Sequence, residues 1–290
     1  MSLRLKFNLV LLAVFLAGFG VAGYVSDGLL QRHAREQVLS EARLLMEAAL
    51  AIRGYTVGQV KPHLVPLLAE RFLPQTVPAY AATETIAVMH KKYPAYDYKE
   101  ATLNPTNPRD RATDWETDLI NEFRNRSEHT EITGTRETPT GPALYIAHPI
   151  RIESAECLPC HSTPDVAPPS MIKVYGTANG FGWKYKEVVG AQVVSVPMAL
   201  PLANAAQALR TFMWSLAAVF LSVFVVLNLM LSWLIIRPVS RMSAAADKIS
   251  TGDFDQPEFP EQGRDEVAVL ASSFNRMRRS LEKAMQMIDS

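Results

Sequence analysis

The sequence contains only two cysteines in 290 residues, and its 29 basic and 29 acidic side chains cancel to a net charge of zero. Balanced charge gives no basic excess of the kind that attracts nucleic acid, so no nucleic-acid partner is expected. A structural zinc site takes four ligands, and no second cysteine pair or matching histidine pair accompanies the first. The sequence also lacks a nucleophile with its base, paired carboxylates and a phosphate-binding loop. We therefore expect neither a zinc site nor an enzyme.

Two uncharged apolar runs interrupt an otherwise mixed sequence. The first has 18 residues, 7–24, and follows Arg4 and Lys6, whereas the second has 25 residues, 212–236. About 20 residues at a rise of 1.5 Å each cross the hydrocarbon core of a bilayer. Both runs are therefore predicted to be transmembrane helices. A cleaved signal peptide is the alternative for the first run, because export signals also place an apolar core after basic residues.

Basic residues in the short flanks of these runs indicate the orientation, because such residues stay in the cytoplasm. Arg4 and Lys6 precede the first run, and Arg237 and Arg241 follow the second. Both termini are therefore expected in the cytoplasm of a bacterium, with the multi-pass chain in the inner membrane. The predicted order is a cytoplasmic N-terminus at 1–6, a transmembrane helix at 7–24, a periplasmic domain at 25–211, a second transmembrane helix at 212–236 and a cytoplasmic region at 237–290.

The exported segment changes from helical to strand periodicity along its length. Residues 26–53 repeat apolar side chains at helical spacing, and Thr113 or Asp114 is a suitable N-cap for a second helix. Later runs are short and apolar or alternating, with a proline- and glycine-containing turn at 138–142. Helices followed by a small antiparallel sheet indicate an α+β domain. The predicted strands are 130–136, 143–152 and 188–196.

Both cysteines lie in the string ECLPCHS, as Cys157 and Cys160, with His161 directly after them. The pattern C-x-x-C-H is typical of haem c attachment, in which each thiol bonds one vinyl group and the histidine ligates the iron. A disulfide or redox thiol pair is the alternative in an exported domain. The haem hypothesis accounts for all three residues, so one covalently bound haem c is predicted.

The second axial ligand of this haem is not determined by spacing. Met198 and His148 lie on apolar strand-like runs and His90 on a helix, so these three are the preferred candidates. An open or exchangeable sixth position is an equal alternative. Such a position would admit NO, CO or O₂.

The cytoplasmic region contains two heptad patterns separated by a connector rich in glycine, proline and acidic residues. Apolar residues step by three and four along 239–249 and again along 267–288. One helical hairpin cannot bury both apolar seams. A parallel homodimer that forms a four-helix bundle is therefore predicted.

The same region resembles the HAMP domain of bacterial transmembrane receptors. The resemblance rests on Pro238 after the membrane span, Gly252 and Asp253 at the end of the first helix, and Asp265 and Glu266 at the start of the second. It implies that movements of the transmembrane helices are relayed to an output module. Pro238 and Glu266 are then expected to be relay residues.

The exported segment resembles, over roughly residues 30–200, a periplasmic family of PAS-like, c-type haem sensor domains long filed as a domain of unknown function. The strings CLPCHSTPDVAPPSMI, YGTANGFGW and EVVGAQVVSVPM carry this resemblance. It implies a PAS-like fold in which Cys157, Cys160 and His161 hold the haem. Some members take their second ligand from a cysteine in the preceding helical region. This chain has no third cysteine, so that ligand cannot be transferred.

These observations predict a transmembrane sensor of redox state or of a small gas. The chain ends at Ser290, soon after the HAMP-like helices, so a separate cytoplasmic kinase, cyclase or chemoreceptor-like protein is expected to receive the signal. One alternative is a membrane-anchored monohaem cytochrome that takes electrons from a periplasmic donor, although this leaves the HAMP-like region unexplained. Another is a receptor for a small organic ligand in which the haem is structural.

Overall fold

The structure is a computed structural model that describes residues 2–139, 141–260, 263 and 265–288. Internal contacts divide the chain into two units, Ser26–Leu209 and the combination of Met1–Val25 with Arg210–Ser290. Helices dominate both ends of the sequence, and the strands lie between them. The elements up to the first strand are α1 (Leu3–Tyr55), η1 (Thr56–Val60), α2 (Lys61–Leu64), η2 (Val65–Ala69), η3 (Pro74–Thr76), α3 (Pro78–His90) and β1 (Asp97–Thr102). They are followed by η4 (Pro108–Asp110), α4 (Asp114–Asn125), β2 (Ile132–Thr138), β3 (Gly141–Arg151), η5 (Ala155–Cys157), α5 (Leu158–His161), α6 (Pro169–Tyr175), β4 (Val188–Pro197), α7 (Ala199–Met230), η6 (Leu231–Ile236), α8 (Arg237–Ser250) and α9 (Glu266–Ile288).

Helix α1 joins the first apolar run and the amphipathic segment after it into one continuous helix. Two helical stretches, Leu3–Ala69 and Ala199–Ser250, are long and apolar enough to cross a membrane, as judged by length and composition. The apolar runs pack on each other through aromatic rings, because Phe15 stacks on Phe220 with ring centroids 4.6 Å apart. The structure therefore has the two candidate membrane helices that the sequence predicts.

Two π-helical segments, η1 and η6, stand directly before α2 and α8, which carry Pro62 and Pro238 in their first turns. Proline has no backbone N–H, and its ring clashes with the carbonyl group four residues earlier. Widening the preceding turn to the π geometry relieves both problems without ending the helix. Pro62 and Pro238 therefore modify the helical path without ending it.

The sheet has four antiparallel strands in the order β1-β4-β3-β2. The predicted strands at 130–136, 143–152 and 188–196 correspond to β2, β3 and β4, and the α+β fold class is confirmed. Strand β1 was not predicted, because three of its six residues, Asp97, Lys99 and Glu100, are charged and no apolar alternation marks it. Its Glu100 is only 3% exposed, and Arg53 of α1 neutralises it there.

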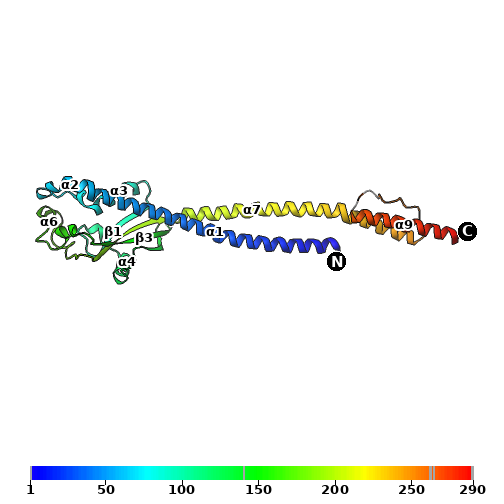
Figure 1. Cartoon of the computed structure of the whole chain (residues 1–290), viewed down its shortest axis with the longest axis horizontal. Coiled ribbons are helices and arrows are strands. Elements are labelled where there is room, and N and C mark those ends of the chain that lie inside the picture. Colours follow the sequence, from blue (N-terminus) through cyan, green and yellow to red (C-terminus); the bar gives the residue numbers. More distant parts are fainter. Residues whose placement is uncertain (1, 140, 261–262, 264, 289–290) are drawn as a thin grey trace. The chain divides into compact units, whose positions relative to one another are not determined.

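Alternate residues of the strands point to opposite faces of the sheet, and each face has its own apolar core. Helices α1 and α3 cover one face and α4 covers the other (Figure 1). Phe123 of α4 is fully buried, and removing such a ring costs about 3–5 kcal/mol. The α1 face buries Val38, Ala42, Met46, Ala49, Ala82, Ile86, Tyr98, Leu144, Ile146, Val194, Val196 and Met198. The α4 face buries Leu119, Ile120, Phe123, Ala147, Val188, Ala191 and Val193.

Local capping signals place α4 as the sequence predicted. Thr113 is the N-cap, and its backbone N–H donates to Glu116 Oε2 at 2.8 Å in a capping box. Glu116 is buried and also pairs with Lys99 Nζ at 2.7 Å. The same carboxylate therefore caps α4 and ties it to β1.

Candidate functional site

The cysteine motif forms one short helical turn after β3. Cys157 ends η5, and Cys160 and His161 lie in α5. Both thiols are free and half-buried. Because residues three apart in a helical turn share a face, the two sulfur atoms are presented to the same side. Among the described residues, no group of three or more His, Cys, Asp or Glu side chains could hold a metal ion.

The imidazole of His161 is held in one tautomer. Its Nδ1 lies 2.8 Å from the carbonyl oxygen of Gly180 and 3.5 Å from Thr106 Oγ1. A carbonyl oxygen can only accept, so Nδ1 carries the proton and the lone pair of Nε2 is left for a metal. Burial lowers the pKa of His161, with a smaller opposing effect of the Gly180 hydrogen bond. Burial, the larger of the two effects, therefore favours the neutral imidazole.

The loop after α6 encloses His161 on a second side. The Trp183 ring stacks on the imidazole, with centroids 4.0 Å apart and an interplanar angle of 12°. Trp183 N donates to His161 O at 3.1 Å, and Gly182 N donates to Ser162 O at 2.8 Å. The orientation of the imidazole is therefore determined by stacking and backbone bonds together.

A buried ion pair links the last turn of α1 to this region. Arg53 Nη1 pairs with Glu100 Oε2, and their side chains are 25% and 4% exposed. Tyr98 OH donates to Glu100 Oε1 at 2.8 Å, and burial raises the pKa of that phenol. Burial alone would lower the pKa of Arg53, but the charges of Glu100 and of Tyr98, and an interaction with Cys157, raise it. Arg53 thus pairs with the sheet and lies within electrostatic range of Cys157.

The helical turn after α1 also contacts the motif. Lys61 Nζ lies 3.2 Å from Glu156 Oε2, next to the first cysteine. Burial raises the pKa of Cys160, although the charge of Lys61 opposes this. Further along, Ser170 Oγ donates to Leu68 O at 2.6 Å, which joins α6 to η2. The motif is therefore enclosed by the end of α1, the turns that follow it, and the loop carrying Gly180.

The residues around the cysteine motif fit the haem c that the sequence predicts. Two free thiols on one face suit two thioether bonds, and His161 presents an unprotonated Nε2 beside them. The stacked indole of Trp183 supplies an apolar wall. We therefore retain haem c as the group that Cys157, Cys160 and His161 would hold.

His90, predicted as a second ligand, ends α3 and lies beside a part of α1 away from the motif. Its Nδ1 is 2.8 Å from Tyr96 O, and Tyr96 OH donates to Glu41 at 3.0 Å. Glu41 and Arg53 are twelve residues apart on α1, which corresponds to about 18 Å. His90 is thus at the level of Glu41, whereas the cysteine motif is at the level of Arg53.

His148 is likewise not brought to the motif. Its Nε2 lies 3.3 Å from Glu131, whose carboxylate also pairs with Arg43 at 2.8 Å. Arg43 precedes Arg53 by ten residues, or about 15 Å along α1. Within the described residues, His148 makes no hydrogen bond or ring contact with His161.

Met198 lies at the opposite end of β4 from the loop that holds His161. Gly190 of β4 pairs with Thr102. Two residues later, Asn104 accepts a hydrogen bond from Gly180 N in the loop that holds His161. Met198 follows Gly190 by eight residues, or about 26 Å of extended strand, and is buried in the core on the α1 face. The structure therefore does not place this thioether beside His161.

His63 lies close along the chain to a residue that contacts the cysteine motif. It lies in α2, two residues after Lys61, which contacts Glu156 of the motif. The sequence does not distinguish His63 from the other histidines, because only the contact of Lys61 with Glu156 sets it apart. Its side chain is exposed.

The predicted relay residues lie in the HAMP-like hairpin. Pro238 stands in the first turn of α8 after η6, and Glu266 opens α9. Asp265 caps α9, because its Oδ1 accepts from Ala268 N at 2.8 Å. The carboxylate of Glu266 is then at the positive end of the helix dipole, where it is stabilising.

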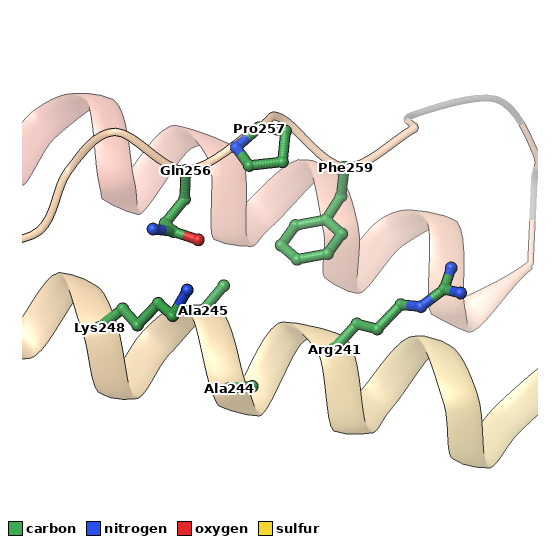
Figure 2. A pocket seen from close by; sticks show the side chains of 7 residues that line it. All are labelled: Arg241, Ala244, Ala245, Lys248, Gln256, Pro257 and Phe259. Atoms are coloured by element: carbon green, nitrogen blue, oxygen red, sulfur yellow. The ribbon is translucent and has the colours of Figure 1, made fainter.

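A cavity of about 250 Å³ lies between α8 and the connector of this hairpin (Figure 2). Phe259 projects from the connector toward α8. Asn275 of α9, 1% exposed, holds the connector by accepting from Phe259 N at 3.1 Å and donating to Phe259 O at 2.9 Å. The cavity belongs to the hairpin and contains no cysteine or histidine. It is lined by Arg241, Ala244, Ala245, Lys248, Gln256, Pro257 and Phe259.

Asp110 offers a pH-dependent test of the domain. Burial raises its pKa to about 6, with Arg109 and Lys99 opposing and Glu100 and Glu84 reinforcing the shift. The folded state therefore binds a proton that the unfolded state releases, so stability decreases as pH rises from about 4 to about 6.

Asp110→Asn is therefore expected to stabilise the full chain on the order of 1–3 kcal/mol above pH 6, with the gain vanishing near pH 4. Thermal unfolding in detergent at pH 4 and pH 7.5 measures this difference. Asp118→Asn, an exposed carboxylate on α4, serves as the control and should change neither midpoint. A gain for Asp110→Asn that is equal at both pH values would contradict the expected burial cost.

Among curated proteins, the heme sensor protein HssS from Staphylococcus aureus strains JH9 and Newman is 31% identical over 111 residues, covering 38% of this chain and 24% of HssS. The chain thus spans about a quarter of the length of these relatives. The crystal structure of the cyanobacterial heme-protein Tll0287 aligns with a TM-score of 0.43 and 16% identity, over 55% of this chain and 94% of that one.

Family profiles match both parts of the sequence. The HAMP domain profile matches residues 230–283, in agreement with the predicted hairpin. The profile of the Tll0287-like family matches residues 31–197, which is more than half of the chain and includes the cysteine motif. The chain therefore belongs to the Tll0287-like family, and a HAMP domain follows its family domain along the sequence.

Proposed function

We propose that this chain is a transmembrane signalling protein in which one haem c, attached to Cys157 and Cys160 and ligated by His161, senses redox state or a small gas. The observation that carries the proposal is the Nδ1–H bond from His161 to Gly180 O, because it leaves Nε2 free beside two unpaired thiols. A bound haem iron supplies a centre that changes oxidation state and exchanges a ligand. The chain acts as a sensor and catalyses no reaction of its own.

The path from the motif to the membrane follows helix α1. Arg53, in the last turn of α1, interacts with Cys157 and is paired with Glu100 of the sheet. A change of charge or ligand at the iron would alter the packing around this ion pair. Since α1 is continuous from Leu3 to Tyr55, a displacement of its end can be carried along the helix. A switch of this kind requires two states that differ by only a few kcal/mol.

The proposal places the chain in a bacterial inner membrane, with the family domain in the periplasm and both termini in the cytoplasm. Basic residues beside the two apolar runs support this orientation.

The HAMP domain then works as a homodimer. Heptad residues of α9 remain exposed in the single chain, as expected for a seam that a second copy covers. These residues include Leu270, Met277 and Leu281, which are 47%, 54% and 45% exposed. The signal passes to a separate cytoplasmic output protein such as a kinase, a cyclase or a chemoreceptor-like protein.

The experiment is performed on the full chain, produced in cells that attach haem c and reconstituted in lipid nanodiscs. A single cysteine introduced at exposed Arg279 would carry a spin label, and the distance between the two copies would be measured for the oxidised, reduced, CO-bound and NO-bound states. Sensing predicts a change of that distance with oxidation state or gas. The Cys157→Ala/Cys160→Ala variant is the matched control, and its distance should not respond.

The runner-up hypothesis, a monohaem cytochrome that only transfers electrons, predicts a different result. In that case the haem would be reduced and reoxidised by partners while the distance between the labelled α9 helices stayed constant. The HAMP domain at residues 230–283 favours sensing over this alternative, because electron transfer has no use for it. A constant distance in all four states would overturn the sensing proposal.

A further inference from the structure

The loop that contacts His161 is itself held by one side chain. Asn104 Oδ1 accepts from Gly180 N at 3.2 Å, and Asn104 Nδ2 donates to Phe181 O at 3.2 Å. The two bonds use both ends of the carboxamide and flank the peptide group whose oxygen accepts from His161. Asn104 belongs to the segment after β1, so it connects two parts of the chain that are 76 residues apart.

The same peptide is restricted by sterics. Gly180 has a positive φ of 84°, and a Cβ atom there would lie 2.0 Å from Thr106 Oγ1. Only glycine therefore allows the loop to approach Thr106 this closely. Because Asn104 and Thr106 restrict the backbone at Gly180, the direction of its carbonyl group is fixed before any ligand binds.

We infer that Asn104 is a positioning residue for His161, which it holds in the Nδ1–H tautomer by fixing the Gly180 carbonyl. The inference rests on the proposed function, in which His161 Nε2 ligates the iron. A strong hydrogen bond at Nδ1 makes the imidazole a more basic ligand, and basic ligands favour the ferric state. Asn104 thereby lowers the reduction potential of the site without touching the iron.

Removal of the carboxamide has a defined expected effect. In Asn104→Ala the peptide groups on both sides of the Gly180–Phe181 peptide lose their side-chain bonds, so that peptide is free to rotate. Loss of such an outer partner typically weakens a metal–ligand interaction 10–100-fold. A tenfold weakening that acts mainly on the ferric state raises the potential of a one-electron couple by about 59 mV.

Two measurements on the full chain in detergent test this inference. The first is the ¹⁵N chemical shift of His161 in haem-free protein, which reports the tautomer and does not depend on haem. The second is the potential of the haem-loaded protein, titrated spectroscopically. Asn107→Ala is the matched control, because Asn107 lies three positions away and its side chain accepts only from Arg109 N. Asn104→Asp keeps the shape and the acceptor for Gly180 N. The His161 tautomer in this variant should therefore remain close to that of the parent.

The expected result is a mixture of tautomers and a raised potential in Asn104→Ala, with the Asn107→Ala variant unchanged in both. An unchanged His161 tautomer in Asn104→Ala would overturn the positioning role, whatever the haem content. If the parent chain carries no covalent haem, the proposed function fails, while the tautomer shift still supports or refutes the role of Asn104.

Discussion

Arg53→Leu is expected to destabilise the Ser26–Leu209 unit by about 3–5 kcal/mol, because it leaves the carboxylate of Glu100 buried without its partner. Glu100 is 4% exposed, so water cannot replace the lost guanidinium. Tyr98 and Gln192 remain nearby, since Gln192 Nε2 donates to Tyr98 OH at 3.3 Å, but neither carries a positive charge. Urea unfolding of the full chain in detergent, followed by circular dichroism, would measure the loss.

The double variant Arg53→Leu/Glu100→Gln separates an unpaired charge from a lost contact. Replacing both members of a buried ion pair is often close to neutral, so the double variant should recover most of the stability. Arg43→Leu is the surface control, since its pair with Glu131 is exposed and should leave the unfolding midpoint unchanged. A single variant as stable as the parent would show that the Arg53 pair does not support the domain.

His161→Gly is expected to remove the protein ligand of the iron while leaving the two thioether bonds available. The substitution opens a space against the Trp183 ring, with which the imidazole stacks at 4.0 Å. Axial ligands set haem potentials over a range of about 0.8 V, so a shift on the order of 0.1 V or more is expected. Visible spectra and a redox titration of the haem-loaded variant measure both changes.

Added imidazole should enter that space and restore the parent spectrum. His129→Gly is the matched control, because His129 faces Glu122 at 3.7 Å and lies outside the motif. It should leave the spectrum and the potential unchanged. A His161→Gly variant with the spectrum of the parent would contradict the assignment of His161 as a ligand.

Patterns with a local cause were predictable from the sequence. The heptads of the HAMP domain, the cap of α4 at Thr113 and the alternation in β2, β3 and β4 all depend on neighbours within a few residues. The C-x-x-C-H string is local as well. Such features are encoded by spacing, so they can be found without knowledge of the fold.

Features that depend on distant partners could not be predicted. Strand β1 was missed because Glu100 looks like a surface residue until Arg53, 47 residues away, is seen beside it. Asn104 could not be identified from the sequence, since its partners Gly180 and Phe181 come from a later loop. Of the three predicted second ligands, Met198 and His148 were chosen for apolar strand-like runs and His90 for its helix, and the register of α1 and β4 places them away from the motif.

Covalent haem is the central claim, and the most direct test is to denature the purified full chain and ask whether haem remains attached. The chain would be produced in cells able to attach haem c, and its mass and haem absorbance would be measured after denaturation and separation. The account predicts one haem per chain for the parent and none for Cys157→Ala/Cys160→Ala. A parent chain that separates from all haem on denaturation, or that carries a disulfide between Cys157 and Cys160, would contradict it.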